Sequence, residues 1–302
     1  MENKKIVVIG SSNTDMVIKA ERFPSPGETI IGNTFMMNPG GKGANQAVAA
    51  ARMGGDVTFI TKTGNDIFGK QSIEQYNAEG IRTDCIFSDP ENPSGVALIA
   101  IDANGENSIL VASGANGTLS VGDIETVKSE IETAGLLVMQ LEIPIETVEY
   151  AAEIASQNGV KVILDPAPAQ SLSSRLLQQL YIITPNSTEA ERLTGVHVHD
   201  RESAERAADC LNKQGVEIVI ITLGADGALV KDGDQYHHIP AEKVKAIDTT
   251  AAGDTFNGAL CVGLSEGLNI VDAVKMACKV SAIAVTRMGA QSSIPYRKEL
   301  EF

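Results

Sequence analysis

The chain has 302 residues, and its 39 acidic side chains outnumber its 24 lysines and arginines, which gives a formal net charge of −15. This charge argues against a nucleic-acid partner or an anionic membrane surface, because both require a basic protein face. The hydrophobic content of 43% and four widely separated cysteines indicate a globular protein of a reducing compartment, and we expect it in the cytoplasm.

Short apolar runs that alternate with helical patterns predict an α/β fold. We predict strands at 6–9, 57–60, 136–141, 160–164, 181–184 and 218–222. These runs are nearly continuous, as expected for parallel strands buried on both faces. Helical patterns lie between them and after them, including one at 44–53 and two at 254–264 and 270–287. The alternation predicts a mainly parallel sheet flanked by helices on both sides.

Two stretches interrupt this alternation and have no helix of their own. Segments 16–37 and 84–112 contain short β-prone runs, prolines and glycines at turn positions. We predict that they form a small accessory β-sheet, which acts as a lid or as an oligomer face. We therefore expect one α/β domain over residues 1–302, with the lid built from these two segments.

Polar residues follow the predicted strands on one side of the sheet. Asn13 and Asp15 follow the first strand, and Glu142, Asn186 and Gly224 follow three later ones. Ligands of open α/β sheets bind at the carboxyl ends of the strands. Asn and Asp together suit vicinal hydroxyls, because they offer paired acceptors or an acceptor with a donor. The alternative is that Asn13 and Asp15 only cap a turn.

A glycine-rich stretch at 40–46 precedes the alanine-rich helix. Its backbone N–H groups can point at an oxygen-rich ligand, or it can be a turn with a helix cap. It is not a Walker A loop, because Ala44 stands where Ser or Thr should follow Gly-Lys. No G-x-G-x-x-G stretch follows the first strand either, which weakens the case for a nucleotide-dependent oxidoreductase.

A second stretch of small residues lies at 248–258. Ala251, Ala252 and Gly253 allow successive N–H groups to converge where a helix begins, which suits the charge on a transferring phosphoryl group. Asp254 can accept the proton of a hydroxyl held beside that anion hole. The alternative is that Asp254 is a first-turn carboxylate that only satisfies the helix dipole.

These two stretches together resemble the two signatures of the ribokinase-like (PfkB) carbohydrate kinases, and the similarity extends over essentially the whole chain. It includes the strings Pro26-Gly27-Glu28-Thr29, Met139-Gln140-Leu141-Glu142, Asp165-Pro166-Ala167-Pro168-Ala169, Thr184-Pro185-Asn186 and Val285-Thr286-Arg287. The combination is most similar to the branch of the family that phosphorylates ribose.

The resemblance implies a three-layer α/β fold with a small β-sheet lid, and ATP-dependent phosphorylation of D-ribose at O5 to give D-ribose 5-phosphate and ADP. Two alternatives remain, which are another sugar or nucleoside kinase of the family, such as a deoxyribose kinase, and a non-catalytic sugar sensor. Asp254 beside an intact Gly253 argues against the sensor, because binding alone needs no base.

The resemblance also implies roles for individual residues. Asp254 would be the base, with Ala251, Ala252 and Gly253 stabilising the γ-phosphoryl group. The ribose would be bound by Asn13, Asp15, Gly41, Lys42, Asn45, Glu142 and Asp254. ATP would be bound by Asn186, Thr222, Gly224, Ala225, Asp226, Gly227, Gly253 and Cys278. Some members have His or Asn where Cys278 stands, so Cys278 either contacts adenine or simply packs.

Two metal ions are implied as well. Glu189 would position Mg²⁺ through water, although Asn186 and Glu189 taken alone match a helix capping box. A monovalent cation, K⁺, would be bound by Asp248, Thr250, Ala284, Arg287, Gly289 and Ser293, several through backbone carbonyls. The lid sheet of the family also pairs two subunits, so a homodimer is expected, with Val17, Ile30, Ile31, Phe35, Val96 and Leu98 either in that interface or packed within the lid.

Overall fold

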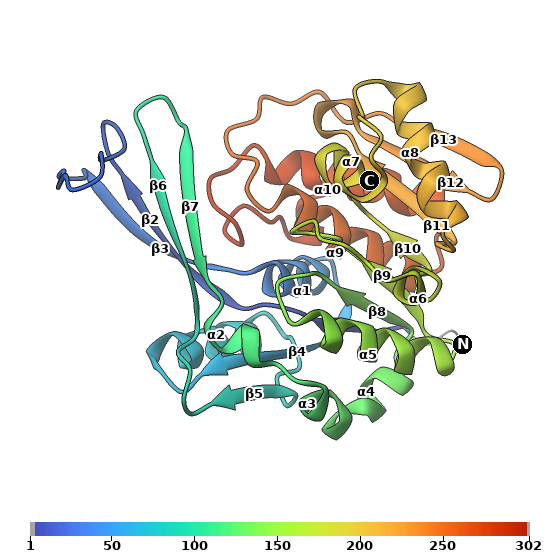
Figure 1. Cartoon of the computed structure of the whole chain (residues 1–302), viewed down its shortest axis with the longest axis horizontal. Coiled ribbons are helices and arrows are strands. Elements are labelled where there is room, and N and C mark those ends of the chain that lie inside the picture. The colour runs from blue at the N-terminus through green and yellow to red at the C-terminus, as the bar shows by residue number, and fades with distance from the viewer. Residues whose placement is uncertain (1–3, 301–302) are drawn as a thin grey trace.

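The computed structural model describes residues 4–300, and within that range nine strands form one large sheet with helices on both faces (Figure 1). Their order is β13-β12-β11-β10-β9-β8-β1-β4-β5, and the neighbours from β11 to β5 are parallel. The strands are β1 (Lys5–Ile9), β4 (Asp56–Gly64), β5 (Ile86–Asp89), β8 (Leu136–Met139), β9 (Lys161–Leu164), β10 (Ile182–Ile183), β11 (Ile218–Thr222), β12 (Ala228–Asp232) and β13 (Gln235–Ile239). The predicted α/β fold is thereby confirmed.

The helices form the two outer layers. They are α1 (Lys42–Arg52), α2 (Ile67–Ala78), α3 (Val121–Thr126), α4 (Lys128–Glu132), α5 (Ile145–Gln157), α6 (Ser174–Leu177), α7 (Ser187–Thr194), α8 (Arg201–Lys213), α9 (Ala252–Ser265) and α10 (Ile270–Ala284). Alternate side chains of β1 pack into two different hydrophobic cores, one on each face of the large sheet. Ile6 and Val8 pack with α1, α9 and α10, whereas Val7 and Ile9 pack with α5 and α8. Within residues 4–300, no helix combines the length and the apolar character that a membrane span requires.

A second, four-stranded sheet extends away from the large sheet and its helices (Figure 1). Its strands, in the order β3-β2-β6-β7, are β2 (Asn13–Lys19), β3 (Thr34–Gly40), β6 (Gly95–Ile101) and β7 (Asn107–Ala112). We call this sheet the lid. One face of the lid is buried at Val17 and Ala97, whereas Ile109 and Val111 of β7 on the same face are exposed. The opposite face exposes the apolar side chains of Ile18, Phe35, Met37, Leu98 and Leu110.

The lid differs from the two predicted segments at their boundaries. Its first strand begins at Asn13 rather than Met16, and its second ends at Gly40 rather than Met37. The segment 84–112 is divided between the sheets, because β5 pairs in parallel with β4 at the edge of the large sheet and only β6 and β7 join the lid. The hairpin of β12 and β13 was not predicted at all.

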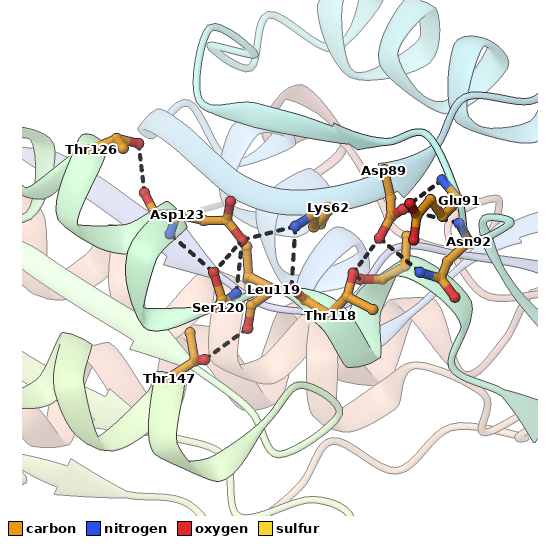
Figure 2. Close-up of polar contacts among 11 residues, drawn as sticks. Lys62, Asp89, Glu91, Asn92, Thr118, Leu119, Ser120, Asp123, Thr126 and Thr147 are labelled. Atoms are coloured by element: carbon orange, nitrogen blue, oxygen red, sulfur yellow. Dashed lines mark hydrogen bonds and ion pairs between the residues drawn. The ribbon is translucent and has the colours of Figure 1, made fainter.

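A group of hydrogen bonds connects the base of the lid to the edge of the large sheet (Figure 2). The 3₁₀ turn η1 (Gly114–Thr118) follows β7, and Thr118 Oγ1 donates to the carboxylate of Asp89 at the end of β5 (2.6 Å). The Asp89 carboxylate also accepts the backbone N–H groups of Glu91 and Asn92. Lys62 of β4 donates to Thr118 O at 3.2 Å. These bonds hold η1 against the edge of the large sheet.

Candidate active site

The glycines at the start of α1 bring β2 and α1 together. A Cβ atom on Gly40 would lie 2.2 Å from Asp15 Oδ2, and Gly41 has φ +89°, where residues with side chains are strained. Only glycine at both positions allows the chain to turn from β3 into α1 beside the root of β2. Asn13 and Asp15 therefore lie in β2, at the first turn of α1, and do not cap a loop turn.

The first backbone N–H groups of α1 are used within the protein. Lys42 N–H donates to Glu142 Oε2 (3.1 Å), and Ala44 N–H donates to Ser11 O (2.9 Å). Ser11 Oγ also donates to Glu142 Oε2 (2.5 Å). The N–H groups of Lys42 and Ala44 therefore point at protein acceptors, of which the Glu142 carboxylate is an anion. Glu142, which was predicted to bind sugar, is fixed as the cap of α1.

The carboxylates predicted to bind the sugar influence one another. The pKa of Asp15 is raised to about 7, first by burial and then by the negative charges of Glu142 and Asp254. These three carboxylates come from β2, from the loop after β8 and from α9, so the fold gathers residues that lie far apart in the sequence. Asp15, Glu142 and Asp254 therefore lie near one another, between the root of the lid and the first turn of α9.

The start of α9 contrasts with that of α1. Ala251 has φ +58°, an unusual left-handed conformation for a residue with a side chain, and no side chain caps the helix. Among residues 4–300, no acceptor engages the amide N–H groups of Gly253 and Asp254. Free amide groups at a helix N-terminus, together with the helix dipole, favour an anion. Of the predicted small residues, Ala252 donates its N–H to Thr249 O (3.2 Å), so the free amide groups begin at Gly253.

Asp254 is buried and held by two amide side chains of α1. Asn45 Nδ2 donates to Asp254 Oδ2 at 2.9 Å, and Gln46 Nε2 donates to Asp254 Oδ1 at 3.0 Å. Gln46 Nε2 also donates to Asp165 Oδ2 (2.7 Å), and Gln46 Oε1 accepts a bond from Gln140 Nε2 (2.7 Å). This network orients the carboxylate of Asp254 at the cavity wall, beyond what capping the dipole of α9 would require.

A cavity of about 180 Å³ opens at the carboxyl ends of β9, β10 and β11, where the sheet topology predicts a ligand. Eight predicted residues line it: Lys42, Asn186, Glu189, Thr222, Ala251, Ala252, Gly253 and Asp254. Asp165, Ala167, Thr184, Thr249 and Asn257 complete the wall. Asn13, Asp15, Gly41, Asn45 and Glu142 lie outside this lining, on the side toward the lid.

Acidic groups dominate the cavity. Burial raises the pKa of Asp165 to about 8, and Asp254 and Glu189 add to this effect against the opposing charge of Lys42. The pKa of Glu189 is also raised, mainly by burial. Burial acts to lower the pKa of Lys42, but the surrounding carboxylates, Asp254 first, outweigh it and raise that pKa. One partly buried ammonium group, that of Lys42, therefore lies among the carboxylates of Asp165, Glu189 and Asp254.

Asn186 and Glu189 form the capping box of α7 that their spacing predicted. Asn186 N–H donates to Glu189 Oε2 (2.8 Å), and Glu189 N–H donates to Asn186 Oδ1 (2.9 Å). Both residues also line the cavity. Asn186 is paired with Thr222 through an isolated parallel bridge, which places α7 and the end of β11 side by side. The structural role therefore coexists with a position at the ligand site.

The remaining predicted ATP residues lie outside the cavity lining. Gly224, Ala225 and Asp226 form the 3₁₀ turn after β11, and Gly227 has φ +95° with no room for a Cβ atom beside Ile239 O. Cys278 is buried on α10 within the hydrophobic core, where burial raises the pKa of its thiol to about 11. Its position is that of a packed core residue.

The predicted K⁺ residues are brought together only in part. Asp248 accepts bonds from Thr250 N–H (2.9 Å) and Gly289 N–H (2.8 Å), which joins the loop before α9 to the loop after α10. The Arg287 side chain instead pairs with Glu299 at 2.7 Å. Ala284 O accepts a turn bond from Arg287 N–H, and Ser293 Oγ donates to Ala290 O.

Several residues at the site were not singled out for a role. Asp165, Thr184 and Asn257 lie within strings that carried the family resemblance, but no role was given to them. Asn257 lies three residues after Asp254 on α9, and that spacing on a helix signals a shared face. The buried oxygens Thr184 Oγ1 and Asn257 Oδ1 have no hydrogen-bond partner within residues 4–300.

Comparison with known proteins agrees with this geometry. The model of the pfkB family carbohydrate kinases matches residues 3–297. The chain belongs to this family of kinases. It is 48% identical to the ribokinase of Haemophilus influenzae over 99% of this chain and 98% of that protein. It is 40% identical to the deoxyribokinase of Salmonella typhimurium over 96% and 95% of the two chains.

Similarity to a solved structure extends over the same length. The structure of Arabidopsis thaliana ribokinase complexed with ribose and ATP is matched with a TM-score of 0.91 and 32% sequence identity. The match covers 99% of this chain and 97% of that one. The large sheet, the helical layers and the lid therefore form the fold of a ribokinase.

Proposed function

We propose that this carbohydrate kinase transfers the γ-phosphoryl group of ATP to O5 of D-ribose, giving D-ribose 5-phosphate and ADP, with Asp254 as the base. ATP-dependent phosphorylation of ribose is the activity that the full-length similarity supports. The observation that carries the proposed mechanism is the buried Asp254 carboxylate, oriented by Asn45 and Gln46 beside unoccupied amide groups of α9.

The chemistry follows from these positions. Asp254 accepts the proton of the sugar hydroxyl while that oxygen forms its bond to the γ-phosphorus and the bond to the leaving oxygen of ADP breaks. The free amide groups of Gly253 and Asp254 stabilise the negative charge on the transferring group. Asn13, Asp15, Asn45 and Glu142 hold the sugar hydroxyls on the lid side.

The cavity also fits a divalent cation. Buried oxygen donors suit Mg²⁺, and the carboxylates of Asp165 and Glu189 would hold it together with water and phosphate oxygens. When bound, Mg²⁺ supplies positive charge that offsets the phosphate groups of ATP.

We propose a separate K⁺ site at the junction of the two loops that Asp248 joins, with Thr250, Ala284, Gly289 and Ser293 as further ligands. A cation there would rigidify the loop that leads into the anion hole. We expect faster turnover in potassium chloride than in choline chloride at equal ionic strength. Equal rates in the two salts would contradict the proposal.

We propose that the chain forms a homodimer through the exposed apolar face of the lid. Five apolar side chains on one sheet face form a patch that monomers rarely leave uncovered. Light scattering coupled to size exclusion should give twice the mass of the chain, and Leu98→Asp on the inner strand β6 should lower it. A wild-type protein with the mass of one chain would contradict this interface.

The substrate assignment is tested by an assay of ADP release over D-ribose, 2-deoxy-D-ribose, hexoses and nucleosides. We expect the highest kcat/KM with D-ribose. The 40% identity to a deoxyribokinase makes 2-deoxy-D-ribose the competing substrate, and a higher kcat/KM for it would reassign the enzyme. Sugar binding without ADP release would indicate a sensor instead.

A further inference from the structure

Asn116 connects the base of the lid to the predicted sugar site. It lies in η1 and is only 1% exposed. Ser12 N–H donates to Asn116 Oδ1 at 2.8 Å, and Asn116 Nδ2 donates to Ser12 O at 3.1 Å. Its Nδ2 also donates to Asn13 Oδ1 at 2.8 Å. These contacts join residues that are 103 and 104 positions apart in the chain.

The orientation of the Asn116 amide is fixed by its partners. A backbone N–H can only donate and a backbone carbonyl can only accept, so the two ends of the Asn116 amide cannot be exchanged. The remaining hydrogen on Asn116 Nδ2 points at Asn13. The atom of Asn13 that receives it must therefore be the oxygen, and the orientation of Asn13 follows from that of Asn116.

Asn13 is thus left with its amino group for a ligand. Among residues 4–300 its Nδ2 donates to no protein acceptor, and that atom is not sealed in the interior. Asn13 lies two residues before Asp15 on β2, so both side chains are on the same face of the strand. Gly95 on β6 makes room for the contact, because a Cβ atom there would lie 2.1 Å from Asn13 Oδ1 and 2.2 Å from Asn116 Nδ2.

We propose that Asn116 is a positioning residue that makes Asn13 a hydrogen-bond donor to a sugar hydroxyl oxygen. The inference rests on the proposed function, because it assumes that Asn13 contacts the sugar. The neighbouring carboxylates of Asp15 and Glu142 accept hydroxyl hydrogens, whereas a hydroxyl oxygen needs a donor. A fixed donor beside fixed acceptors recognises a vicinal diol from both sides. A sugar without that hydroxyl leaves the donor unpaired and binds less tightly.

The test replaces the Nδ2 atom of Asn116 with an oxygen. Asn116→Asp keeps an oxygen for Ser12 N–H but places a second oxygen against Asn13 Oδ1, so Asn13 must turn its amino group away from the sugar. We expect the KM for D-ribose to rise about tenfold or more, with the KM for ATP unchanged within about twofold. In an Asn13→Ala background, the same substitution should change the ribose KM by less than about twofold, because the group it acts through is gone.

Asn116→Ala serves as a second variant, because it removes the bond to Asn13 without placing two oxygens face to face. It should raise the ribose KM by about threefold or more, and only when Asn13 is present. Thr118→Val is the matched control, since it breaks the bond to Asp89 in the same turn and does not touch Asn13 (Figure 2). We expect it to lower Tm and leave the ribose KM unchanged.

Different failures lead to different conclusions. A wild-type enzyme that does not phosphorylate ribose overturns the proposed function. If it does, and Asn13→Ala raises the ribose KM while both Asn116 variants leave it unchanged, the inference about Asn116 is overturned alone. Equal effects of the Asn116 substitutions with and without Asn13, or an equal rise in Thr118→Val, would show a merely structural turn and also overturn it. An Asn13→Ala variant with an unchanged ribose KM would also overturn the inference about Asn116, because Asn13 would then not contribute to sugar binding.

Discussion

Helices α1 and α9 both begin at turns of small residues and pack closely against each other, yet their first turns are used in opposite ways. At α1, the amide of Lys42 is occupied by the carboxylate of Glu142. At α9, the amides of Gly253 and Asp254 have no acceptor within residues 4–300. The two helices touch so tightly that a Cβ atom on Gly258 would lie 2.5 Å from Ala49 Cβ.

This difference shows that a glycine-rich helix start is not by itself a phosphate site. The glycines before and within the first turn of α1 allow backbone segments to approach, since a Cβ atom on Gly43 would lie 2.5 Å from the backbone of Gly10. Gly253 has no atom within 4 Å of where its Cβ atom would be. The first helix start is filled by protein, and the second is left open to a ligand.

The largest effect that the comparison predicts is the loss of the base on α9. Asp254→Asn keeps the size of the side chain and removes its ability to accept the hydroxyl proton, so kcat should fall by about 10³-fold. The KM for D-ribose should change far less. Steady-state kinetics of ADP release measure both values. A variant with nearly wild-type kcat would remove Asp254 from the role of base.

The second prediction compares a Gly→Ala substitution at the start of α9 with one at the start of α1. Gly253→Ala should fold normally but place a methyl group in the anion hole, so kcat should fall about 10²-fold. Gly43→Ala should instead lower the free energy of unfolding by about 1–3 kcal/mol, because the Gly10 backbone must move. Thermal melts and kinetics of both variants check this. A destabilised Gly253→Ala variant with normal kcat would contradict the assignment of the anion hole to the start of α9.

The smallest effect concerns Asp165, which Gln46 links to Asp254. Burial raises its pKa from the ordinary 3.8 to about 8, so between these pH values the folded state keeps a proton that the unfolded state releases. Stability of the ligand-free protein should therefore fall as pH rises through this range. Asp165→Asn removes the titrating group and should stabilise the protein at pH 8.5 by about 1–3 kcal/mol, with a smaller gain at pH 5.

Thermal melts without ligands and Mg²⁺ measure this difference at the two pH values. Asp234→Asn is the control, because Asp234 is an exposed acid in the turn between β12 and β13 and should not change Tm. A constant difference in Tm between Asp165→Asn and wild type at both pH values would show that Asp165 does not titrate in this range.

The sequence predicted the buried parallel strands because their apolar runs reflect burial on both faces, a local property. The helical faces were predictable for the same reason, and Ala204, Ala207, Ala208 and Leu211 are all fully buried. The hairpin of β12 and β13 was missed, although Asp232 and Gly233 carry a turn signal between two β-prone runs. Segment 84–112 was misread in part because β5 has the same β-prone character as the lid strands.

At the site, position along the chain indicated which residues gather at the edge of the sheet. It did not indicate what each one contacts. The bond of Glu142 to the first turn of α1 and the contact of Asn116 with Asn13 connect segments about 100 residues apart, so no local pattern contains them. The family resemblance implied a set of sugar residues but gave no role to the residues that orient them.

Strand β2 joins the two proposed sites through its seven residues. Asn13 and Asp15 at its root lie at the proposed sugar site, and Ile18 near its far end belongs to the exposed apolar face of the lid. If β2 can occupy two positions and a second subunit binds the lid more tightly in one of them, binding of that subunit changes the affinity for sugar. The sugar then changes the affinity between subunits by the same factor. Assembly and ribose concentration are then two variables of one equilibrium, and the degree of association should depend on the sugar.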